Sequence, residues 1–320
     1  MNAIARIAVA LALAGAATIS AAADHYPDRP IHWVVPYPPG GTTDVVARAI
    51  AQRMGERLGV PIVVDNRGGA GGMIGVAFVA HAEADGYTLL VSDASVATAP
   101  SLYKSLSFDP VKDLVPIASF VTVPHVLVVD PALPIRDVPA LVASSRNSRL
   151  NFSSGGIGSP LHLAGEAFRA ASGIVWTHVP YRGAGPAILA VIGGQAQVAT
   201  PSLPSALPQI AGGKLRALAV TSAKRVASLP DVPSMTELGF PGATVNGWIG
   251  LHAPRGVPAA ALARLEEAAA EAIRSPALLS LLHDQGADLA FEAGPAYGRR
   301  VADETARWAR VVKQAGIAPE

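Results

Sequence analysis

Residues 31–44 read IHWVVPYPPGGTTD, and this stretch decides the fold class. Residues 31–36 form a short apolar run typical of a buried strand. The prolines that follow hold the chain extended, and Gly40 and Gly41 let the backbone approach a ligand closely. Thr42, Thr43 or Asp44 can cap a helix that we predict over residues 43–58. A buried strand that turns through glycines into a helix is the repeating unit of an α/β protein.

The same unit recurs along the chain. Further strands are predicted over residues 61–65, 87–91, 150–153, 175–180, 197–200 and 215–220. Further helices are predicted over residues 160–171, 186–192, 258–274 and 295–314. Nearly continuous apolar strands that alternate with helices indicate parallel sheets with helices on both faces.

Two extended stretches interrupt this alternation. Residues 114–130 (LVPIASFVTVPHVLVVD) and 244–253 (TVNGWIGLHA) contain no helical pattern. We interpret both as crossings between two lobes, one made of residues 24–124 plus 247–320 and the other of residues 125–246. Two crossing strands permit a hinge that closes around a ligand. One large sheet with long antiparallel strands is the alternative that the pattern leaves open.

The N-terminus has the pattern of an export signal. Arg6 precedes an apolar run over residues 7–17, and small residues at 20–23 end before Asp24. This order predicts a signal peptide, residues 1–23, that is cleaved near Ala23 and directs the chain to the periplasm. The run is too short and too rich in Ala and Gly for a membrane anchor, which needs about 20 strongly apolar residues.

Composition excludes several classes of protein. Removal of residues 1–23 changes the formal charge from +1 to 0, which does not favour a nucleic-acid or acidic-membrane surface. The absence of Cys excludes disulfides, a thiol nucleophile and a lipid-modified N-terminal Cys. The 297 residues that remain of the 320 suit two domains of ordinary size.

Each predicted strand-to-helix turn lies at the carboxyl edge of a sheet, where ligands bind. A helix start leaves backbone N–H groups unpaired and carries partial positive charge, so a carboxylate or phosphate fits there without an Arg. The two prolines and two glycines of residues 38–41 exceed what a helix cap needs. We therefore favour ligand contact at this turn over an ordinary capped helix start.

Two more turns belong to the first lobe. Residues 66–75 (NRGGAGGMIG) fail the dinucleotide fingerprint because Ile74 occupies the place of its third glycine, so close helix–strand packing is the preferred interpretation. In the next turn, the hydroxyls of Ser92 and Ser95 can donate to an anion. Asp93 between them would repel a carboxylate; an ordinary solvated loop acid is the preferred interpretation over contact with an amino group.

The second lobe supplies turns of the same kind. Ser159 at a cap position with Pro160 directly after it is a well-formed helix start that follows glycines 155, 156 and 158. Another turn runs from Tyr181, which offers a ring face and a hydroxyl, to Pro186. Glycine-lined helix starts from two lobes make a cleft that can hold both ends of a small anion.

Competing chemistries find little support. Residues 156–160 (GIGSP) only imitate the nucleophile motif G-x-S-x-G, and Gly212-Gly213-Lys214 lacks the rest of a P-loop. His162 and Glu166 stand one helical turn apart, but no further clustered ligand supports a metal site, so a side-chain contact or cap is preferred. We expect no catalytic residue, no metal and no cofactor.

Ordered motifs occur in both predicted lobes. They cover residues 35–44, 47–48, 64–75, 85–90 (DGYTLL), 101–103, 180–183 (PYRG), 213–220 (GKLRALAV) and 231–233. Through these motifs the chain resembles the periplasmic solute receptors of tripartite tricarboxylate transporters, often called the Bug receptor family. The resemblance spans essentially all of the chain after residue 23.

The resemblance implies a type II periplasmic-binding-protein fold that binds small carboxylates, such as di- and tricarboxylates, acidic amino acids or aromatic acids, through main-chain groups and water. Carried over, one wall holds Tyr37, Gly41, Thr42, Thr43 and Asp44, to which Ser92, Asp93 and Ser95 add, and the facing wall holds Ser159, His162 and Tyr181. Thr200 and residues 92–95 depart from the family pattern where the distal end of the ligand should lie, so the substrate is not defined.

We therefore expect a monomeric periplasmic binding protein, not an enzyme, that captures a small carboxylate for the membrane subunits of a transporter. A receptor that signals through a membrane sensor is the alternative, since ligand capture is common to both. A nucleotide-dependent enzyme built on residues 68–75 would need a complete fingerprint and a cytoplasmic address, and the sequence has neither.

Overall fold

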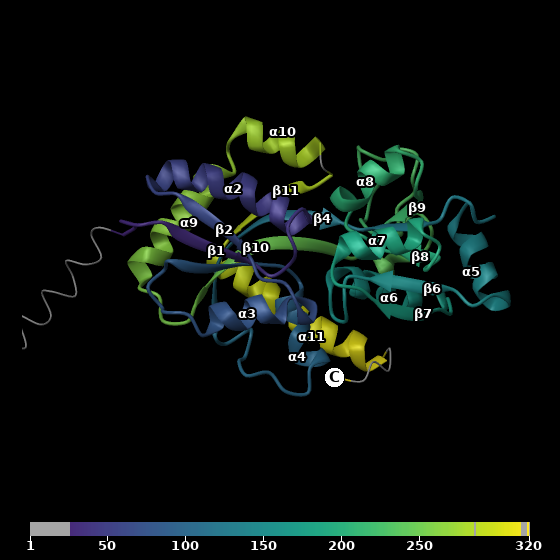
Figure 1. The fold of residues 1–320 in the computed structure, drawn as a ribbon, viewed down its shortest axis with the longest axis horizontal. Coiled ribbons are helices and arrows are strands. Elements are labelled where there is room, and N and C mark those ends of the chain that lie inside the picture. The colour runs from purple at the N-terminus through teal and green to yellow at the C-terminus, as the bar shows by residue number, and fades with distance from the viewer. Residues whose placement is uncertain (1–25, 285, 315–318, 320) are drawn as a thin grey trace, which may run out of the picture.

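The computed structural model describes residues 26–284, 286–314 and 319, so the predicted signal peptide lies outside the described residues. Two mixed β-sheets, each covered by helices, form two lobes that lie next to each other (Figure 1). Among the described residues, none of the helices combines the length and the apolar character that crossing a bilayer requires. The predicted two-lobed α/β fold is confirmed.

In the described part of the chain, the first lobe has a six-stranded sheet with the order β11-β4-β10-β3-β1-β2. Its strands are β1 (Ile31–Val35), β2 (Ile62–Asn66), β3 (Thr88–Ser92), β4 (Leu114–Pro124), β10 (Asn246–Pro254) and β11 (Asp288–Ala293). β1 is parallel to β2 and β3, whereas β10 is antiparallel to β3 and β4. The prediction of purely parallel sheets is wrong here, because the chain leaves this lobe along β4 and returns along β10.

Helices bury both faces of this sheet. One face packs against α2 (Thr42–Leu58), α9 (Ala259–Ala272) and α10 (Pro276–Asp284), and the other against α3 (Met73–Ala80), α4 (Ser95–Leu102) and α11 (Gly294–Gln314). Consecutive side chains of β1 alternate between the two cores: Trp33 and Val35 pack on the first, Val34 on the second. Burial on both faces explains why the strands are continuously apolar.

The second lobe repeats this architecture around a five-stranded sheet, β7-β6-β8-β5-β9, of described residues. Its strands are β5 (Val126–Val129), β6 (Asn151–Ser154), β7 (Thr177–Pro180), β8 (Val198–Ala199) and β9 (Arg216–Val220). One face packs against α5 (Val138–Asn147) and α6 (Pro160–Ser172), and the other against α7 (Ala184–Ile192) and α8 (Leu203–Ala211). β6 is parallel to β7 and β8, and β5 is antiparallel to β8 and β9.

Every helix and strand that we predicted is present, with bounds that differ by one or two residues. The helices α3, α4, α5, α8 and α10, the strand β11 and the 3-10 turns η2 (Ala70–Gly72) and η3 (Pro241–Ala243) were not predicted. Pro100 lies inside α4 and Pro208 inside α8. Proline inside a helix is unfavourable, which hides such helices from a sequence pattern.

Thr221, directly after β9, fastens the two strands that join the lobes. Its hydroxyl accepts from the N–H of His125, between β4 and β5, at 2.8 Å and donates to the carbonyl of Val245, before β10, at 2.6 Å. Its backbone N–H donates to the carbonyl of His125 at 2.9 Å, and its carbonyl accepts from the N–H of Val245 at 3.1 Å. Thr221 is fully buried. One residue therefore holds both crossing strands in register, while the exact lobe boundaries stay a prediction.

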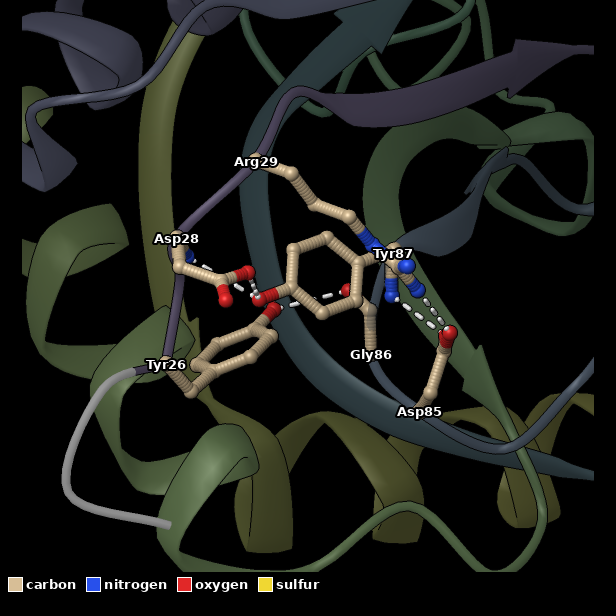
Figure 2. A network of polar contacts seen from close by, with 6 residues as sticks. All are labelled: Tyr26, Asp28, Arg29, Asp85, Gly86 and Tyr87. Carbon is tan, nitrogen blue, oxygen red and sulfur yellow. Dashed lines mark hydrogen bonds and ion pairs between the residues drawn. The ribbon is translucent and has the colours of Figure 1, made fainter. Parts of the chain in front are cut away.

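The motif DGYTLL ties down the segment before β1. The Tyr87 hydroxyl donates to the Asp28 carboxylate at 2.6 Å, and Arg29 forms an ion pair with Asp85 at 2.6 Å (Figure 2). The Arg29 guanidinium also lies 4.1 Å from the centroid of the Tyr87 ring. This part of the family motif thus has a structural role, well away from the cleft.

Close packing of α6 on β6 places the start of α6 beside the cleft. A Cβ added at Gly165 would lie 2.1 Å from Cζ of Phe152, a ring at the centre of the lobe core. We expect Gly165→Ala to lower the free energy of unfolding by about 1–3 kcal/mol, the usual cost of overpacking. Denaturant unfolding measures the effect. Gly185→Ala is the matched control, since an added Cβ there meets nothing within 4 Å. Equal losses in the two variants would contradict this account.

Candidate functional site

A cavity of about 270 Å³ lies between the lobes. Its wall is made by residues 37–43 and Asp93 of the first lobe, by Val123, His125 and residues 247–249 of the crossing strands, and by Gly155, residues 159–161, residues 182–186, Ile188, Ser202 and Ser205 of the second lobe. The strand-to-helix turns selected from the sequence in both lobes therefore meet at one place.

Helix starts supply backbone donors to this cavity. Gly41 is the N-cap of α2 and Gly183 the N-cap of α7, and neither helix has a side-chain cap. The first N–H groups of these helices have no partner within the helix and carry its partial positive charge. Both caps line the cavity. The site can therefore hold an anion with main-chain groups from both lobes.

Asp44 shapes the turn between β1 and α2. Its carboxylate accepts from Gly40 N at 2.9 Å and from Asn66 Nδ2 at 3.0 Å, and it pairs with Arg48 at 2.9 Å. Burial alone would raise the pKa of Asp44, but the hydrogen bonds from Arg48, Gly40 and Asn66 hold the pKa below its usual value. These partners hold the Asp44 carboxylate, which stabilises the turn and does not line the cavity.

Three hydroxyls bridge the lobes at the edge of the cavity. Thr42 Oγ1 at the start of α2 lies 2.8 Å from Ser202 Oγ and 2.7 Å from Ser205 Oγ, and the two Ser oxygens are 2.9 Å apart. Ser202 is the N-cap of α8. A second bridge joins Thr98 Oγ1 to the carbonyl of Gly158 at 3.3 Å. In this structure the lobes are closed on each other.

The predicted site residues divide into two sets. Those that line the cavity are Tyr37, Gly41, Thr42, Thr43, Asp93 and Ser159, and those that do not are Asp44, Ser92, Ser95, His162, Tyr181 and Thr200. The contact of each with a ligand stays a prediction.

Most side chains of the second set have other partners. The Ser92 hydroxyl lies 2.7 Å from His252 Nδ1 and 3.0 Å from the Tyr297 hydroxyl, inside the first lobe. Thr200 Oγ1 donates to the carbonyl of Leu161 at 2.6 Å. Tyr181 packs against the apolar core under α7 and α8. These side chains support the cavity wall from behind.

Asp93 differs from an ordinary loop acid because it is only 5% exposed. Its Oδ1 accepts from the Ser95 N–H at 2.9 Å. Burial raises the pKa of Asp93, whereas hydrogen bonding with Ser95 opposes the shift. Burial and then the Asp93 carboxylate raise the pKa of Tyr37 well above its usual value. The solvated acid considered from the sequence is therefore excluded.

A stacked histidine pair supports the turn before α6. The rings of His162 and His178 lie 4.1 Å apart at 18°. Nδ1 of His162 accepts from the Gly158 N–H at 3.2 Å, and Nε2 of His178 lies 2.6 Å from Ser154 Oγ. Burial lowers the pKa of each ring to about 4. A neutral His162 is required for this geometry, because a protonated Nδ1 could not accept from Gly158. His162 thus contacts His178 and the Gly158 N–H, and the described residues hold no group of three metal-ligating side chains.

Sequence reasoning missed several cavity residues, including His125, Arg182, Ser202 and Ser205. Ser202 had a detectable signal, because it precedes a Pro-containing helix start in the way that Ser159 precedes Pro160. Arg182 is part of the motif PYRG. Nothing in the sequence distinguishes His125, whose buried Nδ1 has no partner among the described residues.

Two closed lobes around an anion-suited cavity define a periplasmic solute-binding protein. The chain belongs to the tripartite tricarboxylate transporter receptor family, whose model matches residues 46–317. This confirms the family predicted from the motifs. The family is one of solute receptors and not of enzymes.

Three relatives illustrate the similarity. Protein BugT of Bordetella pertussis is 39% identical over 315 residues, which cover 97% of this chain and 96% of that protein. An R. palustris protein solved with adipate is 35% identical with a TM-score of 0.88, covering 92% of this chain and 100% of that one. MatC from Rhodopseudomonas palustris, solved with bound malate, is 33% identical with a TM-score of 0.84, covering 90% and 100%.

The histidine pair predicts a loss of stability in acid. The folded-state pKa of about 4 lies below the ordinary 6.5, so the unfolded chain binds more protons between these values. The contribution of the neutral histidine pair to the free energy of unfolding is fully present above pH 6.5 and is lost as the pH falls toward 4. We expect His178→Leu to reduce the slope of unfolding free energy against pH near pH 5 by about 1 kcal/mol per pH unit, since one group is removed.

Denaturant unfolding at several pH values between 4.5 and 7 measures this slope. Replacement of the exposed His32 by Gln controls for the loss of a histidine that is not in the pair. A wild-type protein with constant stability across this range would refute the role of the pair.

Proposed function

We propose that this protein binds a small carboxylate in the periplasm and delivers it to the membrane subunits of a tripartite tricarboxylate transporter. One observation carries the proposal: uncapped helix starts from both lobes, at Gly41 and Gly183, line a single cavity. Donors of this kind suit an anion, and an arrangement that uses both lobes couples binding to closure.

The expected strength of binding is consistent with a receptor. A hydrogen bond to a charged group contributes about 1.5–3 kcal/mol. Three or four such bonds support a dissociation constant near the micromolar range once ordering costs are included. Adipate and malate in the structures of two relatives support a carboxylate as the ligand class.

The proposal extends to processing and organisation. We propose export with removal of residues 1–23 near Ala23, on the pattern of Arg6, the apolar run and the small residues before Asp24. We also propose a monomer in which residues 24–124 plus 247–320 close against residues 125–246.

Isothermal calorimetry of the mature chain against di-, tri-, amino and aromatic carboxylates tests the proposed function. We expect at least one carboxylate to bind with a dissociation constant of about 10 μM or tighter. The uncharged amide of the same compound is the control and should bind far more weakly, because the helix starts favour negative charge. Silence across the whole panel would refute the proposal.

Closure of the lobes predicts an effect of the hydroxyl bridge on affinity. Thr42→Val keeps the shape of the side chain but removes the oxygen that contacts Ser202 and Ser205. We expect ligand affinity to fall about 5- to 10-fold, the equivalent of one hydrogen bond of about 1–1.5 kcal/mol. Thr236→Val, at an exposed hydroxyl contact with Thr244, is the matched control and should bind as wild type does. An unchanged affinity of Thr42→Val would show that the bridge plays no part in closure.

A further inference from the structure

Asp93 is a buried acid that forms no ion pair with a cation among the described residues. It lies in the turn between β3 and α4, lines the cavity and is 5% exposed. Its Oδ1 accepts from the Ser95 N–H at 2.9 Å, and the Ser95 and Tyr37 hydroxyls interact with the carboxylate as neutral donors. Within the described residues, no Lys, Arg or His forms an ion pair with it. Asp44, the other buried Asp beside this cavity, has an Arg, an Asn and a backbone N–H as partners.

A carboxylate removed from water without a cation is costly, and the cost is met when a partner charge arrives. Asp93 lines the cavity, so a charged group of a ligand bound there can reach it. The Tyr37 hydroxyl next to it is also buried; it interacts with the Asp93 carboxylate and can still accept a hydrogen bond. This end of the cavity therefore has a buried carboxylate without a cation and, beside it, a hydroxyl that can accept a hydrogen bond.

The remaining polar walls have the opposite character. The uncapped starts of α2 and α7 carry partial positive charge, and the exposed Arg182 lines the cavity on the side of the second lobe. A ligand with only negative groups would satisfy these walls but would bring like charge toward Asp93, which is unfavourable. A ligand that carries a negative and a positive group satisfies both these walls and Asp93.

Support of the helix start is the simpler explanation of Asp93. The Ser95 N–H belongs to the first turn of α4, and an acid near a helix N-terminus is stabilising. That role uses one oxygen and requires neither a position in the cavity wall nor burial without a cation. Asp137 performs it at the start of α5, where its Oδ1 accepts from Ala140 N in an exposed setting.

We propose that the ligand of this receptor carries a protonated amine as well as a carboxylate, and that the Asp93 carboxylate pairs with the amine. This inference rests on the proposed carboxylate-binding function and narrows its substrate class. Ser95 N–H holds the Asp93 side chain in place, and the Tyr37 hydroxyl accepts a second N–H of the amine.

Matched ligand triplets test the inference in the wild-type protein. Within each triplet, the three compounds carry an amine, a hydroxyl and a hydrogen, in that order, at one carbon and are otherwise alike. The triplets are aspartate, malate and succinate; glutamate, 2-hydroxyglutarate and glutarate; and 4-aminobutyrate, 4-hydroxybutyrate and butyrate. In the triplet that binds most tightly, we expect calorimetry to give an amine at least 10-fold tighter than the hydrogen analogue, with the hydroxyl between them. A hydroxyl or hydrogen analogue that binds as tightly as the amine would overturn the inference while leaving carboxylate binding intact. Silence of all nine compounds beside binding of an amine-free carboxylate of the wider panel would overturn the inference alone, whereas silence of the whole panel would contradict the proposed function itself.

Asp93→Asn separates charge from helix support. The amide oxygen still accepts from Ser95 N–H, so we expect the melting temperature to stay within the change caused by Asp137→Asn, which makes the same substitution at a helix start far from the cavity. We expect Asp93→Asn to abolish the amine preference, with the amine losing at least 10-fold and the hydrogen analogue losing less than 3-fold or gaining. Retention of the preference in Asp93→Asn, or its equal loss in Asp137→Asn, would overturn the assignment. If Asp93→Asn does not fold, the wild-type triplets decide alone.

Discussion

The cavity depends on one constraint, that a helix begins with backbone N–H groups for which the helix itself has no acceptor. In both lobes, strands that end at the cleft turn directly into helices, so these groups gather on its two walls. Glycine at positions 41 and 183 leaves no side chain to satisfy them. Thr221 keeps the walls facing each other because it bonds to both strands that join the lobes. The fold thus exposes the donors that a carboxylate requires.

The sequence predicts local structure well and pairing direction poorly. The predicted strands lie within two residues of the observed ones because burial on both sheet faces makes the strands continuously apolar. The antiparallel pairing of β10 with β3 and β4 was missed, since nothing within a strand records which neighbour it meets. The sequence likewise does not show that Trp308, near the end of α11, packs beside Leu163 of the other lobe. Such contacts join residues more than a hundred positions apart.

Prediction of the site succeeded at the level of turns and failed at the level of side chains. Ser92 and Asp93 are neighbours, yet the Ser92 hydroxyl is bonded inside the first lobe while Asp93 lines the cavity. Adjacent residues at the end of a strand point in different directions, and a residue type does not show which one faces the cleft. Ser202 was missed by two positions for the same reason, because Thr200 before it looked equally polar but donates to Leu161.

Two buried acids of the first lobe show how architecture and recognition can be told apart. Asp44 and Asp93 are both less than a tenth exposed and both follow a strand of the same sheet. The Asp44 carboxylate forms an ion pair with Arg48 and accepts hydrogen bonds from Asn66 and Gly40. Its charge is thus neutralised within the folded chain, and its role is structural. Asp93 has neutral donors from Ser95 and Tyr37 but no cation among the described residues. Backbone donors define the ligand as an anion whatever the side chains are, whereas a side chain without a counter-charge in the wall adds a requirement of its own. On the proposed assignment, the specificity of this receptor lies in the charge that folding leaves without a counter-charge.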